Sequence, residues 1–572
     1  MHLKKTPNRN GRIRLSIVDT YYDKQRKATR QKTIESIGYL DELEKIYDDP
    51  IAHFQKRVDE LREEKKAHKA PINFTFYNSD KLCVGDNLRK NFGYSAFSKI
   101  YHELEIDKFL KRKQRTSKAS YDANTIMKML VYSRLLFPAS KKASYDNREQ
   151  FFEKTDYCLD DVYRCLTFLN KHKENLQVRM NDKIKEQYGR DTGLIYYYVT
   201  NYYFETDGQT DLLRKGVSKE HRPNPIVQMG LFTDNNAIPI TYELFAGNTN
   251  DCLTYRPNFG RIKKQFDLGR VISVADKGMT TGDNIWYTIN TPAKDGYVFS
   301  MSIRGADKSI KNYVLDENGY EWLGEEYKRK SRLYPRTISV TSNNGKKIKK
   351  QVDEKQIVFW SRKYAIRAKA EREATLSKAR DLAKHPGKYT KATSYGAAKY
   401  IKKVDYDKET GEILTASSVL DINEDLIRKE EALDGYYLLL TSEMDTPDDR
   451  IIDIYRGLWR IEESFKITKS ELEARPVYVW TNEHIEAHFL TCFVALTLSR
   501  ILEMKLEHKY SAGRILESLS KASCSLLQHN YYMFDYFDEV LKDIGNLMNI
   551  DFSKRVRTLG DIKQILADTK KK

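Results

Sequence analysis

The chain has 572 residues, which is more than a single hydrophobic core ordinarily holds, so we expect several domains. It carries 99 Lys and Arg residues against 81 Asp and Glu residues, and the resulting net charge of +18 favours a polyanionic partner such as nucleic acid. The mean hydropathy of −0.68 and six cysteines without Cys-x2-Cys spacing argue against a membrane span, a zinc module and a disulfide framework, and they predict a cytoplasmic protein.

The N-terminal third of the chain is predicted to form two regions. Residues 1–75 combine strand patterns within 12–40 with a charged helix at 51–69, as a small α+β region. Residues 76–190 are predicted to be helical, because apolar side chains recur at helical spacing in the segment ANTIMKMLVYSRLLF, which ends at Pro138. We expect this helical region to bind DNA ends.

Strand-like patterns mark the next region, residues 191–303. Three strand candidates are rich in β-branched and aromatic residues, and two later ones are apolar runs typical of buried parallel strands. The five candidates lie at 193–204, 226–233, 237–247, 270–278 and 296–303. Helical connections precede the last two. The resulting order, β-β-β-α-β-α-β, is typical of the RNase H-like fold.

The rest of the chain completes the predicted fold. Residues 304–435 contain short strand candidates and a charged helix, which we interpret as a β-rich insertion. Residues 436–479 return to the core with a strand and one long helix from Pro447 to Glu473, and residues 480–572 are predicted to be helical. The predicted fold class is α/β: an RNase H-like mixed-sheet core, interrupted by a β-rich insertion, with helical N-terminal and C-terminal regions.

Two carboxylates stand where a site that cleaves polynucleotides would need them. Asp276 closes the apolar strand VISVAD, at the edge where parallel strands present functional side chains; alternatively, it caps the next helix. Glu462 lies on the later helix with Lys466 one turn after it; alternatively, the two form a salt bridge on a solvated helix. Carboxylates that converge from separate elements suit two Mg²⁺ ions, which stabilise the attacking and leaving oxygens.

The helix that carries Glu462 is predicted to have two distinct faces. Tyr455, Glu462 and Lys469 are spaced by seven residues and therefore lie along one face. A carboxylate flanked by cations and a phenol suits a metal ligand beside DNA phosphates. The opposite face is apolar and is expected to pack inward. It comprises Ile451, Ile454, Ile461 and Phe465.

The segment YRGLWRIEESFKITK resembles the signature of a large family of bacterial insertion-sequence DDE transposases, Tyr-x2-Arg-x3-Glu-x6-Lys. Tyr455, Glu462 and Lys469 match it in type and spacing. The Arg position is Leu458, and the neighbouring Arg460 lies off that face. The segments VADKGMTTGDNI, GNTND and SKEHRPNPIVQMGLF also resemble family motifs, and a β-rich insertion before the Glu is typical of the group.

The resemblance implies an enzyme that cleaves and joins double-stranded DNA at the terminal inverted repeats of its own element. Asp276 and Glu462 would be the second and third acids, and they would bind two Mg²⁺ ions, which Mn²⁺ can replace. The expected form is a homodimer on DNA in the bacterial cytoplasm, associated with the nucleoid and without a membrane partner. The residues expected to contact DNA are Tyr455, Lys469, Lys466, Arg460, Arg222 and Lys219. For Arg222 and Lys219 the alternative is a solvated turn.

One position departs from the family pattern. The family's first acid lies in a strand context resembling Tyr-Tyr-Asp-Val-Thr, and here Tyr198 stands in its place. A phenol has an ordinary pKa of about 10, so it carries no charge at neutral pH. Asp191 and Asp207 are too far away, at roughly 23–30 Å along an extended strand. Glu205 would face the other side of a regular strand. No neighbour is a convincing replacement.

Several explanations for Tyr198 stay open. The chain is a decayed copy or variant allele, since one base change converts an Asp codon into a Tyr codon. Alternatively, it is a DNA-binding relic or regulator without cleavage activity, or the strand register places another residue at the site. A non-transposing RNase H-like nuclease is a further alternative. We predict that the chain lacks robust strand transfer and that Tyr198→Asp restores it.

Two smaller features of the sequence concern a turn and two tryptophans. Asn248 and Asp251 in GNTND are predicted to form a turn rather than bind a ligand. Trp459 and Trp480 are candidates for stacking on a flipped base, although core packing is the favoured interpretation for Trp459.

Overall fold

The computed structural model describes residues 1–8, 10–23, 28–67, 73–84, 86, 88–206, 208–220, 223–385, 388–389, 394, 396–401 and 422–571. The chain divides into two compact units, Met1–Val84 and Gly85–Lys572. The first unit includes the α+β region predicted at the N-terminus, and the second includes everything after it. The finer boundaries predicted within the second unit stay predictions.

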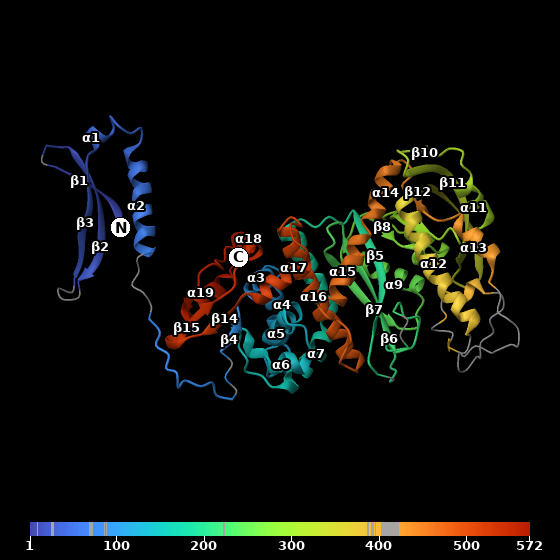
Figure 1. Cartoon of the computed structure of the whole chain (residues 1–572), viewed down its shortest axis with the longest axis horizontal. Coiled ribbons are helices and arrows are strands. Elements are labelled where there is room, and N and C mark those ends of the chain that lie inside the picture. The colour runs from blue at the N-terminus through green and yellow to red at the C-terminus, as the bar shows by residue number, and fades with distance from the viewer. Residues whose placement is uncertain are drawn as a thin grey trace. The chain divides into compact units, whose positions relative to one another are not determined.

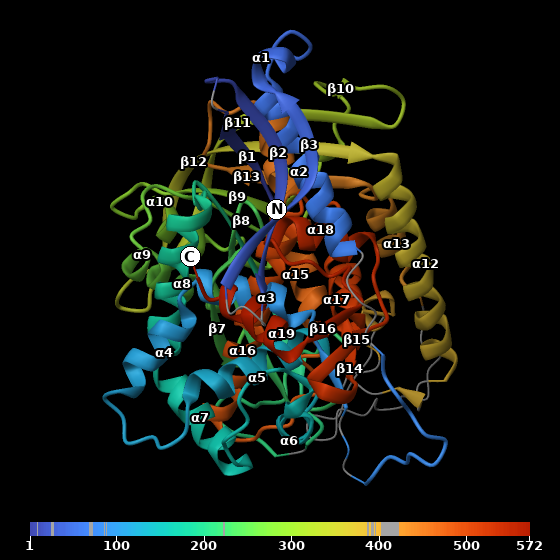
Figure 2. The same ribbon diagram turned by 90° about the vertical axis from the view of Figure 1, so that its left-hand side faces the viewer.

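The first unit is a three-stranded antiparallel sheet in the order β1-β2-β3, with one long helix (Figure 2). Its core includes Leu15, Ile17 and Val58, all fully buried. Its elements are β1 (His2–Pro7), β2 (Ile13–Asp23), β3 (Ala28–Tyr39), α1 (Leu40–Leu43) and α2 (Pro50–Ala67). The first strand was not predicted, because the letters HLKKTP show no apolar alternation. Its pairing with β2 is what makes it a strand.

The second unit begins with helices, as predicted. They follow one short strand: β4 (Arg89–Asn91), α3 (Tyr94–Glu103), α4 (Ile106–Gln114), α5 (Ala123–Leu136), α6 (Lys141–Asp146), α7 (Leu159–Lys171) and α8 (Lys173–Tyr188). Helix α5 is buried along its whole length. It begins where the Asp122 side chain accepts hydrogen bonds from the backbone N–H groups of Asn124 and Thr125, and it ends before Pro138.

A large mixed sheet follows, in the order β10-β11-β12-β13-β9-β8-β5-β6-β7 (green to yellow and orange in Figure 1). Its first five strands along the chain are β5 (Leu194–Tyr203), β6 (Ile226–Asp234), β7 (Pro239–Ala246), β8 (Ile272–Ala275) and β9 (Gly296–Met301). Strands β5, β6 and β7 pair antiparallel, whereas β5, β8 and β9 are parallel. Helices α9 (Asp251–Gln265) and α10 (Gly282–Ile289) precede β8 and β9. Each predicted strand is present, within a few residues of its expected bounds.

The predicted insertion joins the same sheet. Strand β12 pairs with β13 (Tyr436–Thr441), which pairs with β9, so the sheet continues without a break. The insertion contains α11 (Lys308–Leu315), β10 (Glu321–Trp322), β11 (Tyr327–Thr341), β12 (Lys347–Ser361), α12 (Arg362–Lys384) and α13 (Glu424–Glu431). It is therefore a mixed α/β segment, because the 23-residue α12 accompanies the strands.

The C-terminal region is not purely helical, which corrects the prediction. Its helices are α16 (Asn482–Lys505), α17 (Ala512–Lys521), α18 (Glu539–Met548) and α19 (Leu559–Asp568). Between them lie the strands β14 (Ser523–Leu526), β15 (Tyr531–Phe534) and β16 (Val556–Thr558). They form a sheet with β4, in the order β16-β15-β14-β4. Strand β14 pairs with β4, which lies more than 400 residues earlier in the chain, so this sheet depends on a contact between distant segments.

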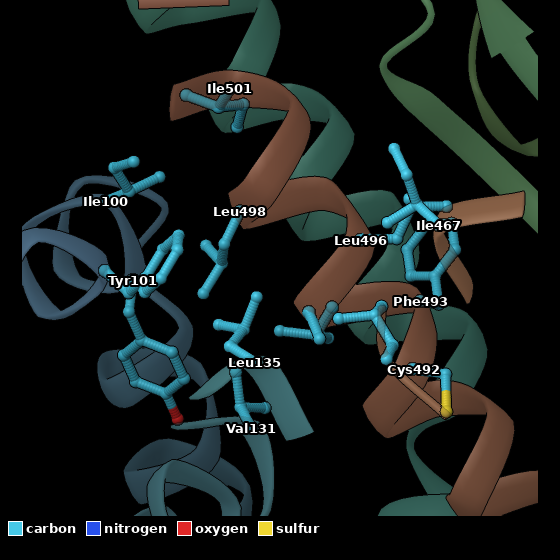
Figure 3. Packing of buried hydrophobic residues seen from close by; sticks show 14 of the residues in the cluster. Ile100, Tyr101, Val131, Leu135, Ile467, Cys492, Phe493, Leu496, Leu498 and Ile501 are labelled. Atoms are coloured by element: carbon cyan, nitrogen blue, oxygen red, sulfur yellow. The ribbon is translucent and has the colours of Figure 1, made fainter. Parts of the chain in front are cut away.

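Helix α16 lies at the centre of the helical core. Figure 3 shows Leu498 facing Ile100 and Tyr101 of α3, while Phe493 and Leu496 lie toward Ile467. By length and composition α16 could span a membrane, which the sequence analysis did not anticipate, and 94% of its apolar window is buried inside the protein. Packing on all sides accounts for its continuous apolar surface.

Candidate active site

Strands β5 and β8 bring together Tyr198 and Asp276, the positions predicted for the first and second acids of the site. Tyr197 and Ala275 are paired in the parallel ladder, so Tyr198 and Asp276 are the next residues along the two strands. On one face of β5, Tyr197 donates a hydrogen bond to Thr254 of α9 at 2.7 Å. The opposite face, with Tyr196 and Tyr198, therefore points toward the helices that follow β13.

Those helices are two rather than one, which corrects the prediction of a continuous helix. They are α14 (Asp448–Arg456) and α15 (Trp459–Lys469). The Tyr196 hydroxyl donates to the Ile454 carbonyl oxygen at 3.1 Å, and it occupies the space that a Cβ at Gly457 would need. The backbone N–H of Leu458 then bonds to Tyr455 O at 2.9 Å, one residue short of α-helical spacing. The side chain of Tyr196, from β5, thus lies at the break between α14 and α15.

Tyr455 and Glu462 still converge on Asp276, although they lie on different helices. The Tyr455 hydroxyl donates to Asp276 Oδ1 at 3.4 Å, and the Ser300 hydroxyl donates to the same oxygen at 2.9 Å. Burial and the negative charge of Asp276 raise the pKa of the Glu462 carboxyl. Two carboxylates thus lie close enough to repel each other. The inward stripe of Ile451, Ile454, Ile461 and Phe465 is buried, as predicted.

Tyr198 lies among these acids. Burial raises its pKa to about 12, and the negative charges of Glu462, Asp276 and Asp251 add to the shift. The phenol is therefore neutral across the physiological range. Its ring centroid is 5.7 Å from that of Phe465, so the ring fills space beneath α15.

The structure also brings Lys219 and Asp251 to this point. The Lys219 ammonium lies 4.9 Å from the Tyr198 ring centroid and 3.5 Å from Asp251 Oδ2, and it donates to the Val199 carbonyl oxygen. Its positive charge offsets part of the rise in the pKa of Glu462. The sequence predicts a turn at Asp251, and Asp251 is the first residue of α9, whose N-cap is Asn250. No spacing in the sequence relates Asp251 to the other acids.

The insertion contributes a further cation that the sequence analysis missed. The positive charge of Arg367, on α12, also offsets part of the rise in the pKa of Glu462. Its guanidinium donates to Glu371 at 2.8 Å. Nearby, the ring centroids of Tyr364 and Tyr437 are 5.0 Å apart, and the negative charge of Asp276 contributes to a raised pKa of Tyr437. The first turns of α12 therefore border the site.

Lys469 lies at the other end of α15. Its ammonium donates to Thr200 Oγ1 at 2.9 Å and lies 3.3 Å from Glu220. Burial and the positive charge of Lys219 lower the pKa of Lys469 to about 8. The predicted partner Lys466 is exposed, one turn before it.

Other predicted positions lie elsewhere or outside the described residues. Arg460 donates to Asn235 O at 2.8 Å, at the turn between β6 and β7, and Leu458 is buried, so it offers no phosphate contact. Trp459 is 56% exposed, which contradicts core packing, because the break before α15 turns it outward. Trp480 is 52% exposed. Arg222 and Asp207 lie outside the described residues.

The lowered pKa of Lys469 predicts a pH-dependent charge at the site. The side chain should be charged below about pH 8 and neutral above it, because burial disfavours the ammonium form. Its unfolded pKa is about 10.4, so folding releases a proton between these values and the contribution of Lys469 to stability rises with pH there. Titration of the labelled 13Cε resonance should give the midpoint. Lys219→Met should raise that midpoint, and an unchanged value would show that Lys219 does not act on Lys469.

The acids present do not fit a site for two metal ions. Among the residues that the structure describes, no three His, Cys, Asp or Glu side chains lie close enough together to hold a metal. Asp276 and Glu462 supply two carboxylates and Tyr198 supplies a neutral phenol near them, while the third nearby acid, Asp251, is paired with Lys219 at 3.5 Å. A pair of divalent ions needs more negative charge than two acids provide.

Comparison with known proteins identifies the family. Residues 207–498, just over half of the chain, match the model of the transposase DDE domain. The chain belongs to the DDE transposases. Residues 3–71 match the model of the N-terminal domain of IS1634 family transposases. The domain is a polynucleotidyl transferase that serves DNA transposition, and its family generally uses divalent metals.

The family also accounts for the sheet. The transposase DDE domain implies an RNase H-like core, and β7-β6-β5-β8-β9 follows the expected order. A cryo-EM structure of the piggyBac transposase synaptic complex with hairpin DNA is 8% identical to this transposase. The match covers 84% of each chain, with a TM-score of 0.34. No curated protein has a sequence significantly similar to this one.

Proposed function

We propose that this transposase binds the terminal inverted repeats of its element as a homodimer, and that Tyr198 blocks the Mg²⁺-dependent cleavage and strand transfer that would follow. The neutral phenol of Tyr198, close enough to Asp276 and Glu462 for their charges to raise its pKa, is the observation that supports this proposal. The chain's positive charge and the cations Lys219 and Lys469 beside the acids support DNA as the substrate. We propose the bacterial cytoplasm, at the nucleoid, as its location.

The chemistry explains why one side chain decides the activity. Hydrolysis of a phosphodiester, followed by attack of the freed 3′ hydroxyl, places developing negative charge on the attacking and leaving oxygens. Mg²⁺, or Mn²⁺ in its place, supplies the neutralising charge in this family when it is bound. Tyr198 removes one carboxylate from the set that would hold it, whereas Lys219 and Lys469 would still supply positive charge for a phosphate.

A second candidate function is a regulator that occupies element ends without cleaving them. The same neutral phenol favours it. Both candidates occupy element ends, so either should lower transposition by the Tyr198→Asp protein expressed in the same cell. Unchanged transposition by that protein would contradict the regulator and the end binding proposed above.

The direct test is to measure binding and cleavage by the unmodified protein. A labelled duplex that carries the element's inverted repeat should bind more tightly than a random duplex, by about 10³-fold. Addition of Mg²⁺ or Mn²⁺ should produce no strand cut at the repeat end above background. Efficient cleavage by the unmodified protein would contradict the role given to Tyr198, and equal binding of both duplexes would contradict recognition of the repeats.

A further inference from the structure

The backbone that follows α15 is held by buried side chains of α5 and α16. Arg134 of α5 donates to the carbonyl oxygens of Leu472 at 3.1 Å and Glu473 at 3.0 Å. His488 of α16 contacts the next carbonyl oxygen, that of Ala474, through Nε2 at 3.0 Å. Consecutive carbonyl groups are therefore fixed by side chains that come from other parts of the second unit.

Lys141 of α6 fixes the orientation of the His488 ring. A carbonyl oxygen only accepts hydrogen bonds, so Nε2 of His488 carries the ring hydrogen and Nδ1 is the acceptor. The side-chain nitrogen of Lys141 lies 2.6 Å from Nδ1 and donates to it. Both side chains are buried, so little water competes for these hydrogen bonds.

Stability alone does not account for this arrangement. Among the residues that the structure describes, Arg134 and Lys141 are held by carbonyl oxygens and an imidazole rather than by carboxylates. Burying positive charge against neutral partners is costly. In addition, Glu473 has a backbone φ of 41°, a left-handed conformation that residues other than glycine rarely adopt. Such a backbone persists only where its surroundings impose it, and such positions cluster at functional sites.

The held backbone is linked to Lys469 at the end of α15. The residue after it, Arg475, forms an ion pair with Glu220. Glu220 in turn lies 3.3 Å from the Lys469 ammonium, which also donates to Thr200 Oγ1 of β5. The path of residues 472–474 therefore sets where Arg475 meets Glu220, and Glu220 forms one side of the surroundings of Lys469.

We propose that Arg134 and His488 are positioning residues for Lys469, the lysine of the family signature. Both act through the backbone that follows α15. Arg134 lies outside the DDE domain matched at 207–498, so the helical region helps to set the geometry of the DDE active site. The proposal rests on the proposed function for the use of Lys469 in DNA chemistry, but it does not depend on the identity of residue 198.

The titration of Lys469 reports its position. Burial lowers the pKa of Lys469 to about 8, so a displaced side chain should titrate nearer to the ordinary pKa of about 10.4. The full-length protein would be titrated without DNA or divalent ions, and the 13Cε resonance of Lys469 would be assigned by its loss in Lys469→Arg. Arg134→Met should raise the midpoint by about one pH unit, because Lys469 becomes less buried.

A pair of His488 variants tests the hydrogen bond to the Ala474 carbonyl oxygen. His488→Gln keeps a side-chain N–H donor and should retain the parent midpoint. His488→Leu removes the donor and should raise the midpoint of Lys469. If Arg134→Met does not fold, the two His488 variants decide the question.

Arg190→Met is the control for a general loss of stability. The Arg190 side chain is also buried, and it donates to the Pro239 carbonyl oxygen at 2.9 Å, but it precedes β5, whereas Lys469 contacts Thr200 near the end of that strand. Arg190→Met should unfold at lower urea concentration and leave the midpoint of Lys469 unchanged. A parent-like midpoint in folded Arg134→Met or His488→Leu, or an equal shift in Arg190→Met, would overturn the proposal. Cleavage is not measured, so the outcome is independent of the role given to Tyr198.

Discussion

Replacing Tyr198 with aspartate is expected to raise Mg²⁺-dependent cleavage at the inverted-repeat end by about 10³-fold. Tyr198 and Asp276 directly follow the last paired residues of β5 and β8, and a pKa of about 12 keeps Tyr198 neutral. Aspartate at the same position adds a carboxylate to Asp276 and Glu462 and removes a bulky ring. A single-turnover assay with a labelled duplex would measure the gain.

Two controls separate charge from shape at position 198. Tyr198→Asn removes the ring without adding charge and should stay inactive, and Glu462→Gln should abolish the activity gained by Tyr198→Asp. The added carboxylate should also create metal-dependent stability: Mn²⁺ at about 100 times its Kd would stabilise the Tyr198→Asp protein by about 2.7 kcal/mol. An Asn variant as active as the Asp variant would contradict a role for the charge.

Arg500→Met is expected to lower the free energy of unfolding by about 3–5 kcal/mol. Arg500, on α16, is 2% exposed, and it donates to Glu503 at 2.6 Å, Glu463 at 3.1 Å and Ser464 at 2.9 Å. It also donates to the Arg460 carbonyl oxygen at 3.0 Å. Arg500 therefore fixes α15 against the helical core. Its loss leaves the buried Glu503 without its arginine partner.

The control for Arg500 is a second arginine with less burial. Arg514 lies 3.2 Å from Glu517 with 44% of its side chain exposed, so Arg514→Met should cost less than about 1 kcal/mol. The double variant Arg500→Met/Glu503→Gln should recover part of the loss, because no unpaired buried charge remains. Urea denaturation would measure the free energy of unfolding of the two single variants and the double variant. Equal effects at Arg500 and Arg514 would show that Arg500 does not anchor α15.

The regular parts of the core were predictable because their signals are local. Strands β5 to β9 have the apolar and β-branched patterns expected of their places in the sheet, and α5 has a clear cap and a proline stop. Elements without a strong local pattern could not be predicted from the sequence. Strand β1 and the C-terminal strands are short or polar. They are stabilised by pairing with a partner strand, which their own residue patterns do not indicate.

The acids of the site were predictable in identity, but their surroundings were not. Spacing alone indicated Tyr455, Glu462 and Lys469. It also suggested one straight helix, and the hydroxyl of Tyr196, more than 250 residues earlier, lies at the break. The exposure of Trp459 follows from that break.

The sequence by itself determined the family signature, the order of strands and the presence of tyrosine where an acid is expected, because each is a property of consecutive residues. Only the tertiary structure decided that Lys219, Asp251 and Arg367 gather around Tyr198 and Glu462. These residues come from separate loops and helices. Their mutual charges act through space, so no local pattern in the sequence records them.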